Sequence, residues 1–117
     1  MIKIIREHPN YAVSDQGVVY RITKNGYKEL KPDYSKGYAI VKLDRKNCYV
    51  QRLVAENFVQ RYHDDQTAIV HVDNNIRNNQ SSNLVWLSPS GCQRVKDWRI
   101  EYRKDYLKEL AKLNNII

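Results

Sequence analysis

The sequence is short of the residues on which several common classes of site depend. It has two cysteines, Cys48 and Cys92, which are too few for a disulfide framework and are not at Cys-x-x-Cys spacing, so we expect reduced thiols. Its four glycines do not cluster into a phosphate-binding loop. It also has no run of about 18 apolar residues, so no membrane-spanning segment is predicted.

The first residues carry no sign of an export signal. Residues 1–9 lack the apolar core and the small-residue cleavage site of a secretory signal peptide, so the expected location is the cytoplasm. With 117 residues, the chain is long enough for one compact domain around one hydrophobic core.

Positive charge is concentrated in the first half of the chain. The formal net charge is +7, and residues 1–62 hold 12 basic and 6 acidic residues, whereas residues 63–91 hold 1 basic and 3 acidic residues. A basic segment rich in tyrosine is typical of a surface that follows phosphate groups. An ordinary solvated Lys/Arg surface would give the same composition, so the charge alone leaves both interpretations open.

Alternating apolar residues and turn signals predict a β-rich first half. Asp15–Gly17 is a hairpin turn, and Asn25–Gly26 is the strongest hairpin signal in the chain. Pro9 is expected to stop the first strand. The predicted strands cover residues 2–6, 11–14, 18–22, 28–30, 38–43 and 48–51.

The pattern changes in the second half. Residues 52–62 have the spacing of a helix, and residues 67–72 and 83–87 are predicted as paired strands around an Asn-rich loop. Ser88 is a good N-cap and Pro89 suits the first helical position. We expect one long helix from there to about residue 113.

An apolar stripe follows the predicted final helix at steps of three and four residues, so one face of the helix should be buried or bound. A bound face can contact a partner protein or a second copy of the chain, and the two uses stay open. The stripe consists of Val95, Trp98, Tyr102, Tyr106, Leu110 and Leu113.

His71 is the most informative candidate for chemistry. Strand alternation turns it away from Val70 and Val72, towards the face it shares with Asp73. A neutral histidine there can act as a general base, or it can simply bond a neighbouring carbonyl. The asparagines of the following loop are interpreted mainly as turn residues, because their side chains bond locally and tolerate positive φ.

The order of motifs resembles that of HNH endonucleases encoded by phages and introns. Residues 11–18 (YAVSDQGV) resemble the opening of the modular DNA-binding segment in front of these nucleases, and residues 30–43 and 50–58 match its "LKP…GYxxVxL" and "VHRLVAxxF" runs. Residues 71–86 resemble the HNH core "HIDGNxxNNxxxNLEW". The match runs from about residue 9 to residue 95.

This resemblance implies an α+β fold with an antiparallel β-rich N-terminal segment, an HNH ββα-metal-like unit and a long C-terminal helix. We place these parts at residues 1–62, 63–96 and 97–117. The resemblance also implies double-stranded DNA as the partner, Mg²⁺ or another divalent metal as the cofactor of an active enzyme, and a phage-infected bacterial cell as the setting. It makes His71 the general base and Asn83 the residue that orients this histidine and its loop.

The metal-ligand positions depart from the family. Val70 precedes the histidine where the family has Asp or Asn, and Cys92 stands where the family has an Asn ligand; Gln51 also replaces the histidine of "VHRLVA". Mg²⁺ prefers oxygen ligands, which neither valine nor a thiol supplies. Asp73 and Cys92 are the remaining metal candidates, and the enzymatic status of the chain stays open.

The leading hypothesis is a DNA-binding HNH-type protein with weak or lost nuclease activity. One alternative is an active metal-dependent nicking endonuclease. The other is a phage-type protein that binds and inhibits a host or defence protein through its last helix, and the same helix could form a homodimer. The residues predicted to bind DNA are Arg21, Lys24, Lys28, Lys31, Lys36, Lys42 and Arg52.

Overall fold

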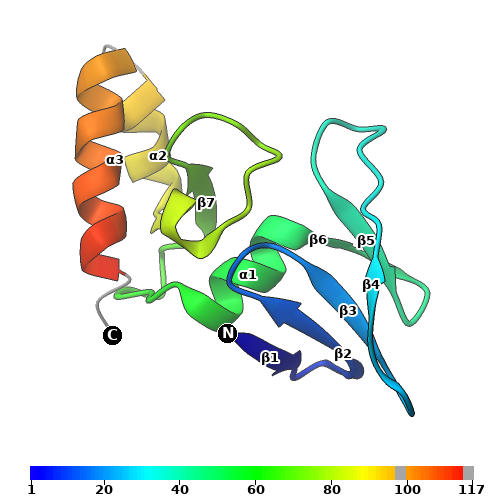
Figure 1. Cartoon of the computed structure of the whole chain (residues 1–117). Coiled ribbons are helices and arrows are strands. Elements are labelled where there is room, and N and C mark those ends of the chain that lie inside the picture. The colour runs from blue at the N-terminus through cyan, green and yellow to red at the C-terminus, as the bar shows by residue number, and fades with distance from the viewer. Residues whose placement is uncertain (97–99, 115–117) are drawn as a thin grey trace.

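The computed structural model describes residues 1–96 and 100–114, which fold into antiparallel sheets and three α-helices, a mixed α and β architecture as predicted (Figure 1). In chain order the elements are β1 (Ile2–Ile5), β2 (His8–Ser14), β3 (Val19–Thr23), β4 (Gly26–Leu30), β5 (Ile40–Leu43), β6 (Lys46–Tyr49), α1 (Val50–Phe58), β7 (Ala68–His71), the 3-10 turn η1 (Ser81–Asn83), β8 (Leu84–Leu87), α2 (Pro89–Lys96) and α3 (Ile100–Asn114).

Strands β1 to β4 form one antiparallel sheet in sequence order. The predicted turns at Asp15–Gly17 and Asn25–Gly26 are confirmed, and both glycines have the positive φ that such turns favour. The role expected of Pro9 is wrong, because Pro9 lies inside β2 rather than ending β1. The register shifts between Ile4 and Ile5, so the proline sits at an irregular point of the ladder where its missing N–H costs little.

Helix α1 follows the β5–β6 hairpin directly and is shorter than the predicted helix over residues 52–62. It ends at Phe58, and Val59 is already extended. The indole Nε1 of Trp86 donates to the carbonyl oxygens of Ala55 (3.3 Å) and Val59 (3.2 Å). A buried indole needs such acceptors, and it finds them at the C-terminal end of α1, where the Ala55 carbonyl also accepts from the Val59 N–H at 3.1 Å.

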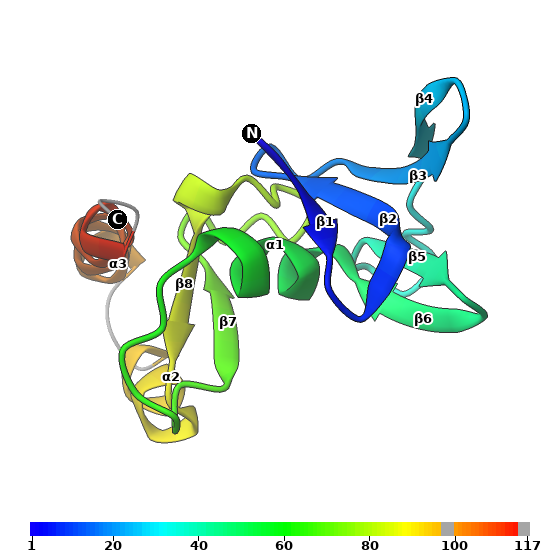
Figure 2. The same ribbon diagram turned by 90° about the horizontal axis from the view of Figure 1, so that it is seen from below.

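The β7–β8 hairpin separates two hydrophobic clusters (Figure 2). Leu84 and Trp86 face α1 and the N-terminal strands, whereas Val85 and Leu87 face α2 and α3. This alternation follows from the strand period of two. The hairpin is therefore buried on both faces, which explains why β8 is apolar throughout.

The single long C-terminal helix that we expected is wrong. Figure 1 shows α3 beside α2 rather than as its continuation. Leu107 and Ala111 of α3 pack in the same cluster as Val95 of α2 and the hairpin. One straight helix over residues 89–113 would be about 37 Å long and would carry its last turns away from that cluster.

The folding back of α3 also changes which of its residues are buried. Leu107 is fully buried, while Tyr106 and Leu113 of the predicted stripe are exposed. The stripe residue Trp98 and the side chain of Tyr102 lie outside the described residues. The face of α3 that packs against the chain therefore carries Leu107 and Ala111, which the predicted stripe did not include. No helix in the described ranges is long and apolar enough to cross a membrane.

Candidate functional site

His71 ends β7 and is 6% exposed. Its Nε2 lies 2.8 Å from the amide oxygen Oδ1 of Asn79, which is also buried. Because an amide oxygen only accepts hydrogen bonds, Nε2 carries the proton and Nδ1 keeps its lone pair. This contact therefore favours, for the neutral ring, the tautomer with its proton on Nε2 and its lone pair on Nδ1.

The loop after His71 is closed by a second set of hydrogen bonds around Asp73. The side chain of Asn83 accepts from the Asp73 backbone N–H (3.1 Å) and donates to Asp73 Oδ1 (2.9 Å) and the Asn78 carbonyl (2.8 Å). Asp73 also accepts from the Asn75 N–H and the Asn78 amide, each at 2.8 Å. A metal at Asp73 would have to displace these donors.

The same bonds fix the charge of Asp73. Partial burial alone would raise the pKa of this carboxyl, but hydrogen bonds from Asn78, the Asn75 backbone and Asn83 outweigh it, and the pKa lies below its usual value. Asp73 is therefore ionised at neutral pH and organises the loop as a carboxylate.

The two predicted catalytic residues make separate hydrogen bonds at the loop end of the hairpin. Asn83 bonds the loop, whereas Asn79 bonds the His71 ring. Asn79 is one of the asparagines that the sequence interprets mainly as turn residues, and it matches an asparagine of the HNH core motif. The sequence does not show that it contacts the ring, because the path of an irregular loop decides which of several asparagines reaches His71.

The opposite side of the hairpin holds the two altered positions. Val70 is buried with Val85 and Val95, and Cys92 packs against this cluster. Among the described residues, no group of three or more His, Cys, Asp or Glu side chains is placed to hold a metal. A valine methyl group and a thiol within an apolar cluster do not fit Mg²⁺, so these residues do not form a magnesium site.

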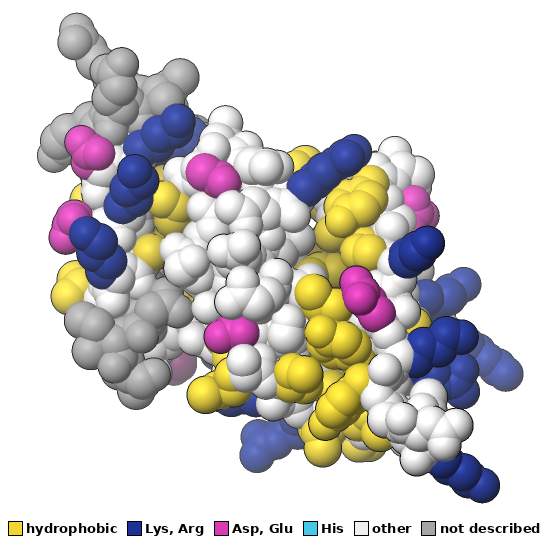
Figure 3. Space-filling view, in the orientation of Figure 1, with side chains coloured by type: hydrophobic (Ala, Val, Ile, Leu, Met, Phe, Trp, Pro, Cys, Tyr) yellow, Lys and Arg dark blue, Asp and Glu magenta, His cyan; other side chains and the backbone are white. Residues whose placement is uncertain are grey.

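All seven residues predicted to bind DNA are exposed. Figure 3 shows Lys and Arg side chains gathered along the side of the molecule formed by β3 to β6, next to exposed hydrophobic side chains. Arg21 and Lys28 lie directly opposite each other on β3 and β4, a like-charge pair that an anion would relieve. Arg52 differs from the rest, because its Nε pairs with Glu56 at 3.2 Å.

The N-terminal segment and the residues that follow β7 are in contact at the β2–β3 turn and in the connection between β4 and β5. The guanidinium of Arg77 stacks over the Tyr34 ring at 4.6 Å, and the Ser81 N–H donates to the Asp15 carbonyl at 2.8 Å. The basic segment and the His71 loop are therefore in direct contact, so DNA bound to one would lie beside the other.

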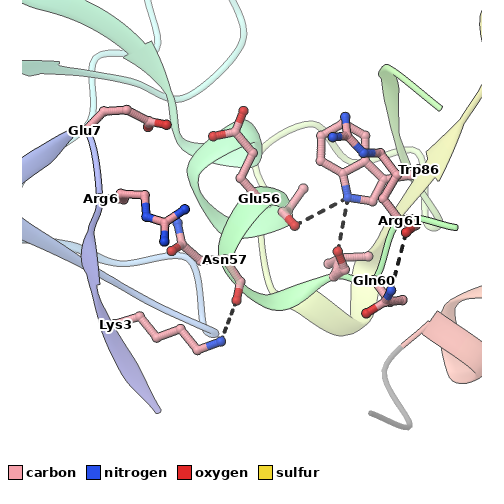
Figure 4. A pocket seen from close by; sticks show the side chains of 10 residues that line it. Lys3, Arg6, Glu7, Glu56, Asn57, Gln60, Arg61 and Trp86 are labelled. Atoms are coloured by element: carbon pink, nitrogen blue, oxygen red, sulfur yellow. Dashed lines mark hydrogen bonds between the residues drawn. The ribbon is translucent and has the colours of Figure 1, made fainter. Parts of the chain in front are cut away.

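A cleft of about 710 Å³ lies between β1 and α1, away from these residues (Figure 4). Its wall mixes Arg6 and Arg61 with Glu7 and Glu56. Arg61 stacks over the Trp86 ring at 5.2 Å. None of the predicted site residues lines it, and its mixed charge selects neither an anion nor a cation.

Comparison with known proteins agrees with this arrangement. Residues 2–44 match the NUMOD4 motif. The chain is 30% identical over 112 residues to one uncharacterized HNH endonuclease of Acanthamoeba polyphaga mimivirus (92% of this chain, 27% of the relative) and 31% identical over 89 residues to another (73% and 26%). It thus spans about a quarter of the length of these curated relatives.

A solved structure extends the likeness to the fold. The HNH homing endonuclease I-HmuI, whose structure is described as showing DNA binding and cleavage, matches with a TM-score of 0.65 and 30% identity over 92% of this chain and 60% of that chain. The motif covers residues 2–44, while one viral relative and this structure each match over 92% of the chain. The chain therefore belongs to the HNH-type homing endonuclease family.

Proposed function

We propose that this chain binds double-stranded DNA and hydrolyses it weakly or not at all. The observation that carries the proposal is the position of Val70 and Cys92 in one hydrophobic cluster, where relatives would place metal ligands. An Mg²⁺ ion has no oxygen ligand at either position. On the other side of the hairpin, the His71 ring is held by a hydrogen bond to Asn79. The candidate base therefore has a polar partner, whereas the two metal-ligand positions lie in an apolar cluster.

Binding is supported by the charges of the N-terminal segment. Six of the seven residues predicted to contact DNA form no ion pair within the described part of the chain, whereas Arg52 does. When unpaired Lys and Arg side chains bind a phosphate backbone, they release the counterions condensed on the DNA. This release favours binding. The matched structure, I-HmuI, is described as binding DNA, and its likeness covers the same segment.

Weak chemistry is expected from what His71 can do alone. Its Nδ1 can accept a proton from an attacking water, and a positioned base contributes typically 10²–10⁴-fold. The charge that develops on the phosphate and on the leaving oxygen has no metal to stabilise it. Because that stabilisation is the larger contribution in metal-assisted phosphoryl chemistry, a base without it leaves the reaction slow.

The binding half of the proposal is tested by gel shift on duplex DNA over a salt series. We expect binding at low salt, with a logarithmic salt slope that falls by about 1 in Lys28→Gln, because one phosphate contact is lost. Arg52→Gln is the matched control. It removes the same charge from a residue already paired with Glu56 and should change the slope less. No duplex binding at low salt would refute the proposal.

The chemical half is tested by plasmid nicking with Mg²⁺ and Mn²⁺, beside His71→Ala. We expect the native chain to leave the plasmid supercoiled, as the variant does. Metal-dependent nicking that disappears in His71→Ala would instead establish the alternative, an active nicking endonuclease.

The setting of this function follows from the same comparison. The curated relatives come from a giant virus, so a virus-infected cell and its cytoplasm form part of the proposal, and the phage origin expected from the sequence has no separate support. Neither the viral relatives nor the matched structure supports binding of a host protein or a second copy through α3, so neither is part of the proposal.

A further inference from the structure

Asn79 lies at a contact between two distant segments of the chain. It is 5% exposed and sits under the β2–β3 turn at Gly17. A Cβ added to Gly17 would lie 2.9 Å from the backbone carbonyl oxygen of Asn79 and 3.1 Å from the Cβ of Asn79. These distances are too short unless the backbone of one residue shifts. Gly17 also has φ of +86°, which a side chain would strain. The turn therefore approaches Asn79 to a distance that only glycine allows.

The turn is held firmly in this place. The Ser14 hydroxyl accepts from the N–H groups of Gln16 (3.3 Å) and Val18 (3.1 Å), and Ser14 is itself buried. The Asp15 carbonyl accepts from Ser81 N–H at 2.8 Å, on the other side of Asn79. The loop that carries Asn79 is thus fixed by backbone contacts to the N-terminal sheet and not only by its own side chains.

The partner of Asn79 is the ring of His71. The amide oxygen of Asn79 lies 2.8 Å from Nε2. The side chain of Asn83, by contrast, forms its hydrogen bonds with Asp73 and Asn78. The described contacts therefore assign the ring to Asn79 and the loop to Asn83.

We infer that Asn79, seated against Gly17, is the positioning residue of His71. Its amide oxygen keeps the proton on Nε2 and presents Nδ1 as the basic nitrogen, and the N-terminal segment supplies the support for this arrangement. The inference deepens the proposed function, since it concerns the base of that site, but the state of the ring can be observed without DNA or catalysis.

The ring state is measured by ¹⁵N and proton NMR of the whole chain, with His8 and His63 as internal references. In the native chain, we expect a separate Nε2-bound proton signal for His71 that exchanges slowly with water, because the proton is buried in a hydrogen bond. Asn79→Leu keeps the shape but removes the acceptor, so this signal should be lost. Asn79→Asp keeps an accepting oxygen and should retain it.

The role of the N-terminal turn is tested by Gly17→Ala against Gly26→Ala. Both glycines have positive φ, but a Cβ at Gly26 meets nothing within 4 Å. The two variants therefore share the backbone strain, and only Gly17→Ala pushes on Asn79. We expect at least a tenfold faster exchange of the His71 Nε2 proton in Gly17→Ala and no change in Gly26→Ala.

Several outcomes would overturn the inference. A slowly exchanging His71 signal in a folded Asn79→Leu variant would show that another group holds the ring. If both glycine variants changed the exchange rate of the His71 Nε2 proton equally, Gly17 would act only through backbone strain and not through its contact with Asn79. If Asn79→Leu does not fold, loss of the signal in Asn79→Asp would also count against it. Failure of duplex binding or efficient nicking by the native chain would refute the proposed function and leave these NMR results unaffected.

Discussion

Both faces of the β7–β8 hairpin pack on apolar clusters, but they differ in chemistry at the end where β7 meets the following loop. Towards α1, His71 is held by Asn79, and the following loop by Asp73 and Asn83. Towards α2 and α3, Val70 and its neighbours make an apolar cluster. The comparison teaches that the proposed base and the two positions aligned with the family's metal ligands lie in separate sets of contacts, so one set can differ without the other.

The physical chemistry of the two faces explains why such a state is stable. Buried polar groups on the first face each have a hydrogen-bond partner, and removing one partner would leave the other buried and unsatisfied. On the second face, apolar side chains gain about 25 cal/mol per Å² of buried surface, whereas an unpaired carboxylate there would cost free energy. Hydrophobic residues at positions 70 and 92 therefore secure α2 and α3 without a metal.

The largest effect is expected when ligands are put back on the apolar face. Val70→Asp combined with Cys92→Asn supplies carboxylate and amide oxygens, so Mg²⁺ should raise plasmid nicking on the order of a hundredfold over the native chain. Nicking is measured as conversion of supercoiled plasmid. Without metal, the buried carboxylate should lower the free energy of unfolding by roughly 3 kcal/mol.

The control for this experiment is the same pair of substitutions with His71→Ala, which should abolish the gained activity. Thermal melting with and without Mg²⁺ adds a readout that does not depend on catalysis, because a bound ion stabilises the folded state. If the double variant neither nicks nor melts at a higher temperature with Mg²⁺, the apolar face is not a lost metal site.

The next effect concerns the packing of α3 on the apolar face. Leu107→Ala removes a fully buried side chain from the cluster and should lower the free energy of unfolding by about 2–5 kcal/mol in urea. Leu113→Ala, in the same helix but 58% exposed, should change it by less than about 0.5 kcal/mol. Equal effects would mean that α3 does not pack on the hairpin through Leu107.

The smallest effect is a pH dependence on the polar face. Hydrogen bonds hold the pKa of Asp73 below that of the unfolded chain, so the stabilisation is present above the unfolded pKa of about 4 and is lost as the pH falls through the folded pKa. Asp73→Asn should therefore flatten the acid limb of a stability profile measured by urea unfolding between about pH 2 and pH 6.

Asp33→Asn provides the comparison for that profile. Asp33 also has a pKa below its usual value, because it accepts a hydrogen bond from the Ser35 backbone N–H at 2.9 Å, but it is fully exposed. Its replacement should flatten the profile less than Asp73→Asn does. The reverse order would show that the loop hydrogen bonds contribute less than the contacts imply.

Local features of this protein could be predicted from the residues alone. The turns at Asp15–Gly17 and Asn25–Gly26 depend on residues that tolerate positive φ, and the start of α2 depends on the Ser88 hydroxyl, which accepts from Gly91 N–H at 3.0 Å. The lack of ligand oxygens at Val70 and Cys92 is likewise a property of the side chains themselves. These signals act over a few residues, so no distant contact is needed to interpret them.

Tertiary structure decided what local signals could not. Helix α1 ends where the Trp86 indole reaches its last carbonyls, and α3 turns back because the hairpin offers an apolar face that Leu107 can cover. Asn79 reaches His71 because Gly17, 62 positions away, leaves room for it. Each of these outcomes depends on which surfaces meet in space. Hydrophobic periodicity shows which face of a segment is apolar, but not which other segment packs against that face.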